Sequence, residues 1–223
     1  MNLKLLHIFL LSTAGTFLLC TPFINTVELA NGLVTGKMCW FHLAMLFFSV
    51  CVFFVMLTKK GTVIAFTFSD PLVLFFAGGV LITYKWNLNP EPEKLIFAGQ
   101  LVILWFLLRY VLTAYREFKF FFLFVLMFTG LIEAVWGMQQ LHGYSHSNHS
   151  LFRLTGSFFN PGPYSGYIAV ILPVCLWTAL RFQKGMHYFA WICVGAILIV
   201  LPAGMSRSAW IAAVVACGWV YWT

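Results

Sequence analysis

The chain contains few charged residues. Only 9% of its 223 residues are Asp, Glu, Lys or Arg, whereas about 25% is usual for a soluble domain. Hydrophobic residues make up 62%, so water is not the main solvent of this protein. Its net charge of +7 is spread singly or in pairs between apolar runs and forms no continuous basic face. We therefore predict no nucleic-acid partner and expect a lipid bilayer around the chain.

The sequence also lacks the spacing typical of disulfide frameworks and metal sites. The six cysteines are isolated, without Cys-x-x-Cys spacing, and we interpret them as small hydrophobic residues. His142, His146 and His149 lie in a polar loop that has no carboxylate or cysteine, which favours solvated side chains over metal ligands. The sequence predicts no metal and no cofactor. It also shows no internal repeat and no soluble domain.

Long apolar runs dominate what is present. A helix crosses a bilayer with about 20 apolar residues. Eight hydrophobic segments approach this length, at Leu5–Ile24, Met38–Leu57, Thr62–Tyr84, Leu95–Ala114, Phe120–Leu141, Tyr164–Leu180, Tyr188–Ala203 and from Ala209 onward. The sequence thus predicts an all-α fold, a polytopic integral membrane helix bundle with four spans in residues 1–119 and four segments in residues 120–223.

The first and last segments need separate interpretation. Leu5–Ile24 has features of a secretory signal, but further spans follow, so we expect an uncleaved first helix. The segment from Ala209 has 15 residues, or about 22 Å at 1.5 Å per residue, against a hydrocarbon core of about 30 Å. We interpret this last segment as incomplete and the protein as truncated.

The positive-inside rule predicts the orientation of the bundle. With the N-terminus in the cytoplasm, the cytoplasmic ends hold seven basic residues, namely Lys4, Lys59, Lys60, Arg116, Lys119, Arg181 and Lys184. The opposite ends hold four, namely Lys37, Lys85, Lys94 and Arg153. The long loop His142–Pro163 and the turn Gly204–Ser208 are then expected on the same face, opposite the cytoplasm.

The first candidate site is the Gly- and Pro-rich run Arg153–Tyr167, at the mouth of a predicted helix. Pro163 is favourable near a helix start, and free backbone N–H groups there attract anionic oxygen. Asn160 is expected either to cap the helix or to bind a sugar hydroxyl. Gly162 and Gly166 are spaced for close approach of another helix. A capped helix entry with close packing is the structural alternative.

The second candidate is Arg207, a lone guanidinium between Ser206 and Ser208 and between two apolar segments. Arginine offers a planar fork of donors suited to phosphate, and it is costly to place near lipid without an anion. Snorkelling of the side chain to the interface is the alternative. Because Arg153 is expected on the same face, both arginines could reach one pyrophosphate.

The third candidate is a polar stripe on a predicted span. Glu133, Gly137 and Gln140 have i, i+4 and i+7 spacing, which places them on one helical face. An ionisable group within a span is a functional candidate, so Glu133 is expected to orient Arg207 or Arg153, or to accept a proton. A structural pair that holds two helices together is the alternative.

Two other charged residues are predicted to have structural roles. Asp70 precedes a proline and is expected to cap a helix N-terminus. Arg109 lies about one turn from the cytoplasmic end of its segment and is expected to snorkel.

Three motifs within residues 120–223 resemble the bacterial superfamily of O-antigen ligases, O-antigen polymerases and protein O-oligosaccharyltransferases. They are Glu133-Ala-Val-Trp-Gly-Met-Gln139, Thr155-Gly-Ser-Phe-Phe-Asn-Pro-Gly162 and Ser206-Arg-Ser-Ala-Trp210. The resemblance implies a metal-independent membrane glycosyltransferase that uses an undecaprenyl-pyrophosphate-linked glycan donor. The acceptor would be a sugar or protein hydroxyl, at the periplasmic face of the bacterial inner membrane.

The resemblance also implies roles for individual residues. Arg207 would be catalytic and would neutralise the pyrophosphate leaving group. The substrate-binding residues would be Arg153, Gly156, Asn160, Ser206 and Glu133. Family members carry a further periplasmic loop with a histidine that activates the acceptor, and this chain ends before any such loop.

A different class of protein is also compatible with these residues. In a membrane transporter or a non-catalytic structural membrane protein, Glu133 and Arg207 would form a gating or packing pair.

Overall fold

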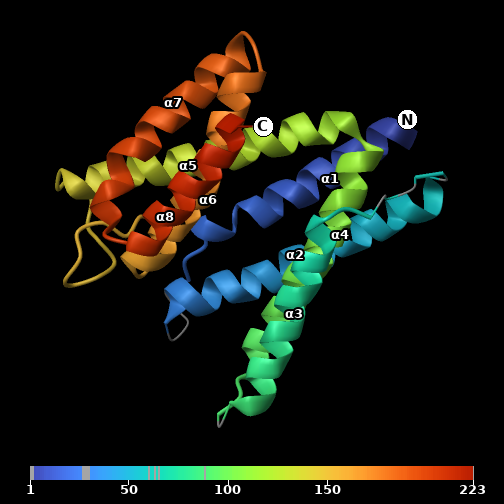
Figure 1. Ribbon diagram of the computed structural model, residues 1–223, viewed down its shortest axis with the longest axis horizontal. Coiled ribbons are helices and arrows are strands. Elements are labelled where there is room, and N and C mark those ends of the chain that lie inside the picture. Colours follow the sequence, from blue (N-terminus) through green and yellow to red (C-terminus); the bar gives the residue numbers. More distant parts are fainter. Residues whose placement is uncertain are drawn as a thin grey trace. The chain divides into compact units, whose positions relative to one another are not determined.

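A computed structural model describes residues 3–26, 31–59, 61–62, 64, 66–87 and 89–222 (Figure 1). These residues form eight α-helices and two 3₁₀-helices, and no strand occurs among them. The α-helices are α1 (Leu3–Leu19), α2 (Gly32–Thr58), α3 (Ser69–Trp86), α4 (Pro92–Ala114), α5 (Arg116–Leu141), α6 (Pro161–Arg181), α7 (Gly185–Val200) and α8 (Arg207–Trp222). The 3₁₀-helices are η1 (Thr21–Phe23) and η2 (Pro202–Gly204). Each α-helix overlaps one predicted segment; Lys60 and Thr223 lie outside the described residues.

Five of the described helices are long and apolar enough to cross a membrane. They are α2, α4, α5, α6 and the stretch Gly185–Gly204, which joins α7 to η2. They contain 20 to 27 residues, and about 20 are needed for one crossing. The chain is therefore an all-α, multi-pass membrane protein, as the apolar runs predict.

The chain divides into two compact units. The first comprises Met1–Leu18 and Phe41–Phe120, and the second comprises Leu19–Trp40 and Phe121–Thr223. The second unit thus includes the start of α2 together with α5 to α8, and it contains every candidate site residue.

In the first unit, α3 packs along α4 (Figure 1) around a buried carboxylate. Asp70 is fully buried, and its Oδ1 forms an ion pair with Arg109 and accepts a 2.9 Å hydrogen bond from Trp105 Nε1. Its Oδ2 accepts the backbone N–H of Thr67 at 2.7 Å. The predictions that Asp70 caps a helix and that Arg109 snorkels are both wrong, because the two side chains pair with each other and connect α3 to α4.

In the second unit, α6 packs against both α7 and α8 (Figure 1). Half of the most apolar stretch of α6 is buried, the largest share among the candidate spans. Gly130 on α5 lies directly against Ile171 on α6, and a Cβ at Gly130 would lie only 2.7 Å from Ile171 Cγ2. The absence of a side chain at Gly130 therefore allows α5 and α6 to approach closely.

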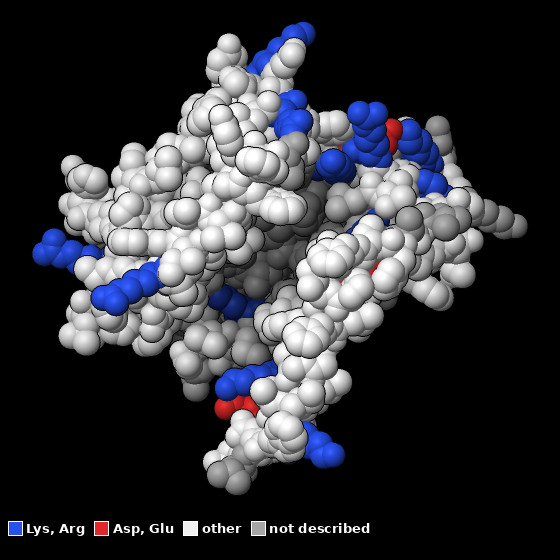
Figure 2. Space-filling view, viewed as in Figure 1, with Lys and Arg blue, Asp and Glu red and all other residues white. Residues whose placement is uncertain are grey.

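The surface matches the bilayer assignment. On the face shown in Figure 2, uncharged side chains cover most of the surface, and basic side chains stand singly or in small groups. Large apolar side chains are widely exposed; Phe75 is 83% exposed and Val214 is 73% exposed. Extended apolar surface of this kind is unfavourable in water and favourable in contact with lipid.

We predict that Gly130→Val destabilises the protein, because the added side chain must displace the buried Ile171 side chain. Overpacking of this kind costs about 1–3 kcal/mol. A Cβ at Gly99 on α4 would meet no atom within 4 Å, so Gly99→Val is the matched control. Thermal unfolding in detergent should give a lower midpoint for Gly130→Val than for Gly99→Val, and equal midpoints would contradict close α5–α6 packing.

Candidate functional site

The candidate site centres on the loop between α5 and α6, residues 142–160, which the last turns of α5 hold in place. The Gln140 side chain makes four hydrogen bonds to this loop. Its Oε1 accepts the backbone N–H groups of Thr155 and Gly156 at 2.9 and 2.8 Å. Its Nε2 donates to the carbonyls of His146 and Gly156 at 3.0 and 3.1 Å. One amide therefore uses all its donors and acceptors to fix two points of the loop.

Asn148 holds the same loop from within. Its Nδ2 donates to the carbonyls of Gly156 and Phe158 at 3.2 and 3.0 Å, and its backbone N–H donates to Thr155 Oγ1 at 3.2 Å. The backbone N–H groups of Thr155 and Gly156 and the carbonyls of Gly156 and Phe158 thus find partners in two side-chain amides rather than in regular secondary structure.

Glu133 lies two turns before Gln140 on α5 and is fully buried. Its Oε2 accepts the backbone N–H of Ser157 at 3.0 Å, whereas its Oε1 is buried without a hydrogen-bond partner among the described residues. Lys37, from the first turns of α2, interacts electrostatically with this carboxylate. Lys37 Nζ also donates to the Ile24 carbonyl at 2.7 Å and lies 5.7 Å from the centre of the Phe158 ring.

The shared face of Glu133, Gly137 and Gln140 is confirmed, and it contacts the loop and α6. Tyr164 on α6 donates its hydroxyl to the Glu133 carbonyl at 3.2 Å. A Cβ at Gly137 would overlap with the Tyr164 hydroxyl. Gly156 has a φ of +54°, and a Cβ there would overlap with both Glu133 Oε2 and the Tyr164 ring. Glycine is required at Gly156 by both conformation and space.

Asn160 caps α6. Its Oδ1 accepts the backbone N–H of Gly162 at 2.9 Å. Of the two roles expected from the sequence, helix capping and binding of a sugar hydroxyl, the structure shows helix capping. Gly162 and Gly166 are not in tight contact with another helix. A Cβ at Gly166 would meet nothing within 4 Å, and one at Gly162 would meet only Asn160 Oδ1, at 3.5 Å. The expected close approach at this glycine pair is absent.

A cavity of about 480 Å³ lies beside the glycine pair, between α6 and α8. One group of lining residues lies where α6 and α8 begin: Gly162, Ser206 and Ser208. The others are small and apolar: Gly166, Ala169, Val170, Pro173, Ala209, Ala212 and Ala216. The cavity is thus a largely apolar slot with serine hydroxyls and a helix start at one end.

The turn that carries Ser206 and Arg207 is attached to α6. Ser165 Oγ donates to the Gly204 carbonyl at 3.0 Å, and a Cβ at Gly204 would overlap with that hydroxyl. Trp210 Nε1 donates to the Leu201 carbonyl at 2.9 Å, which joins the first turn of α8 to the end of α7. These contacts fix where α8 begins, and Arg207 is its first residue.

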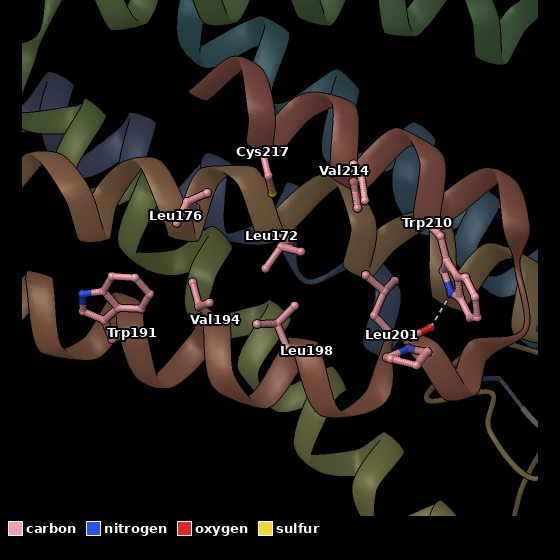
Figure 3. Close-up of a pocket in the computed structure, with 11 residues that line it drawn as sticks. Leu172, Leu176, Trp191, Val194, Leu198, Leu201, Trp210, Val214 and Cys217 are labelled. Atoms are coloured by element: carbon pink, nitrogen blue, oxygen red, sulfur yellow. Dashed lines mark hydrogen bonds between the residues drawn. The ribbon is translucent and has the colours of Figure 1, made fainter. Parts of the chain in front are cut away.

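A second cavity, of about 470 Å³, lies among α6, α7 and α8 (Figure 3). Its walls are apolar side chains and Cys217, and the Trp210 indole N–H in it is already bonded to Leu201. No Asp, Glu, His, Lys or Arg lines this cavity, and its one ionisable lining group is the Cys217 thiol.

The structure brings some predicted site residues together and leaves others apart. Glu133 Oε2 lies beside Gly156 and accepts the N–H of the next residue, Ser157. Ser206 lines the slot between α6 and α8. Arg153 and Arg207 are exposed, and neither side chain forms a hydrogen bond or ion pair with another described residue. Glu133 therefore does not orient either arginine in this structure.

Sequence reasoning gave no individual role to Lys37, Asn148 and Tyr164, which complete the site. The apolar runs place Lys37 in a connection, but α2 begins at Gly32 and includes it. A hydrogen-bonding role for Asn148 has no local signal, because its partners are seven to ten residues away along an irregular loop. Among the described residues, no group of three His, Cys, Asp or Glu side chains is arranged to hold a metal ion.

Together the fold and site define an all-α, multi-pass membrane protein with a fixed polar loop at the ends of α5 and α6. No protein-family model, no curated protein and no solved structure matches the chain.

We predict that Gln140→Leu releases the loop. Losing four hydrogen bonds while keeping side-chain volume should cost about 2 kcal/mol or more of local stability. Hydrogen exchange measured by mass spectrometry should then show about thirtyfold faster exchange of the Thr155 and Gly156 amides. Gln139 is exposed, so Gln139→Leu is the matched control. Unchanged exchange in Gln140→Leu would contradict the role of this amide.

We also predict that Gly156→Ala disrupts the loop, whereas Gly143→Ala is tolerated. Both glycines have positive φ, +54° and +80°, so both variants incur the backbone penalty of about 1 kcal/mol. Only at Gly156 would the new Cβ overlap with other atoms, since nothing lies within 4 Å at Gly143. Limited proteolysis within residues 142–160 should be faster for Gly156→Ala than for Gly143→Ala, and equal rates would refute the packing argument.

Proposed function

We propose that this protein is a membrane glycosyltransferase of the O-antigen ligase or polymerase type. It transfers a glycan from an undecaprenyl-pyrophosphate donor to an acceptor hydroxyl at the periplasmic face of the bacterial inner membrane, with its N-terminus in the cytoplasm. The observation that carries the proposal is the slot between α6 and α8, which is apolar along its length and has serine hydroxyls at one end.

The slot matches the chemistry of a lipid-linked pyrophosphate. Such a donor is an amphiphile with a charged head and a long hydrocarbon tail. Its tail would lie against the small apolar residues of α6 and α8, and its head would lie near Ser206 and Ser208. The volume of about 480 Å³ is in the range of ligand sites, about 300–1,000 Å³.

Arg207 is the catalytic residue in this proposal. It lies in sequence between the two serines that line the slot, is exposed, and has no anionic partner among the described residues. Its guanidinium would neutralise the charge that develops on the pyrophosphate as the bond to the sugar breaks. Arg153, on the loop from α5, would bind a further anionic part of the donor.

The other predicted residues act by shaping the site. Asn160 caps α6 beside the slot, and Gly156 and Glu133 fix the loop that carries Arg153. Charged groups that the fold already holds in position are effective in catalysis, because they need no rearrangement as charge develops on the leaving group.

A transporter is the second candidate, and the environment of Glu133 favours it. Glu133 is a fully buried carboxylate in a span, one of its oxygens has no hydrogen-bond partner among the described residues, and Lys37 interacts with it. Ionisable groups in such positions are typical of proton-coupled transport.

We predict that Arg207→Lys loses about 10²–10³-fold in glycan transfer, because lysine keeps the charge but not the planar fork. The protein, in the longest form its reading frame encodes, is reconstituted in proteoliposomes with a lipid-linked oligosaccharide, and the transferred glycan is measured. Arg181→Lys is the control, since Arg181 is an exposed residue at the far end of α6. Normal transfer by Arg207→Lys would remove Arg207 from the mechanism. If the membrane-inserted wild-type protein transfers no glycan but carries a solute flux, and Glu133→Gln abolishes that flux, the transporter is favoured instead.

A further inference from the structure

A third cavity, of about 330 Å³, is formed by the last residues of α5 and the loop that follows. Unlike the other two, it is lined mainly by polar side chains: Gln140, His142, Ser145, His146, Ser147 and Arg153. Its volume lies in the range of small-ligand sites. Gln140 and Ser147 already use their polar atoms to hold the loop. The side chains left to contact a ligand are therefore His142, Ser145, His146 and Arg153.

The charge in and around the cavity favours an anion. Arg153 supplies a fixed positive charge, and no Asp or Glu lines the cavity. The sequence contains no Asp or Glu at any position after Glu133, and Glu133 itself is enclosed against Ser157. Among the described residues, no carboxylate is paired with the Arg153 guanidinium, so none of them competes with a ligand's acid group.

Two other lining groups are suited to hydroxyls. His142 Nδ1 lies 2.8 Å from the Met138 carbonyl, so this nitrogen carries the hydrogen, and Nε2 of the neutral ring is left as an acceptor. The Ser145 hydroxyl is buried without a partner among the described residues, so it can turn toward a ligand without breaking a hydrogen bond. The cavity thus combines an anion-binding fork with a hydroxyl acceptor and a hydroxyl that both donates and accepts.

An aromatic surface adjoins these groups. Tyr144 is 85% exposed, and its ring lies nearly parallel to the His142 ring, with an interplanar angle of 21°. The Tyr144 backbone N–H donates to the Gln139 carbonyl at 2.8 Å, which ties this part of the loop to α5. An exposed aromatic face beside polar donors and acceptors suits a ring that has both C–H and hydroxyl groups.

We infer that this cavity binds a single sugar residue that bears an acid group. The acid group contacts Arg153, and ring hydroxyls contact His142 Nε2 and Ser145 Oγ. This deepens the proposed function, because it names an acidic glycan as the substrate class. The role of the cavity in glycan transfer rests on the proposed function, whereas its binding of an acidic sugar does not.

The test measures binding in the absence of any transfer. The full chain in lipid nanodiscs is titrated with methyl glucuronide, methyl glucoside or inorganic phosphate, and saturation-transfer NMR gives the affinities. We expect the glucuronide to bind about tenfold or more tightly than the glucoside. Equal affinities, or phosphate displacing the glucuronide while the glucoside fails to do so, would overturn the inference by indicating no acid preference or a simple anion site.

Variants separate ligand contacts from loop structure. Arg153→Ala should abolish the preference for the glucuronide, and Arg181→Ala should leave it unchanged. Ser145→Ala should weaken both glycosides without lowering the unfolding midpoint, because the hydroxyl makes no hydrogen bond to the described residues. A preference that persists in Arg153→Ala, or glycoside affinities unchanged in Ser145→Ala, would overturn the inference.

The two proposals can fail independently. Arg207→Lys should retain glucuronide binding although it loses transfer. Transfer without glucuronide binding would support the proposed function and overturn this inference. Selective glucuronide binding without transfer would support this inference and count against the proposed function.

Discussion

Buried side chains of α5 replace water for the backbone of the loop that follows it. Gln140 satisfies two N–H and two carbonyl groups of that loop, and Glu133 satisfies the Ser157 N–H. Leaving such groups enclosed without partners would cost about 1–3 kcal/mol each. The position of Arg153, the cap at Asn160 and the cavity at the end of α5 all depend on this loop being held, so the site depends on two polar residues of one span.

The helices were predictable because the thickness of the bilayer sets the length of an apolar run, and that length can be counted directly in the sequence. Their ends were less so, for reasons visible at α2. This helix begins at Gly32 rather than at Met38, and it therefore includes Lys37, whose Nζ donates a hydrogen bond to the Ile24 carbonyl. A hydropathy pattern excludes a charged residue from a span, whereas tertiary partners admit it.

The same division applies to the candidate site. The common face of Glu133, Gly137 and Gln140 follows from helical periodicity alone. Its partners do not, since Ser157 and Tyr164 meet Glu133 only when the chain returns from the loop into α6. The error at Asp70 has the same origin. Local sequence predicted Asp70 as the residue before a helix, but Asp70 lies within the first turn of α3, and its Oδ1 pairs with Arg109, 39 residues away.

The basic residues of the two units differ in how their charge is balanced. Arg109 in the first unit is paired with Asp70, whereas Arg153 and Arg207 form no ion pair with another described residue. A lipid head group or an anionic ligand can therefore supply the counter-charge at these two arginines. A ligand that binds there in the folded state and not in the unfolded one stabilises the protein, by an amount that grows with the logarithm of its concentration relative to Kd. In the second unit, anion binding and the gain in unfolding free energy that it produces are consequently linked, so either one can be used to measure the other.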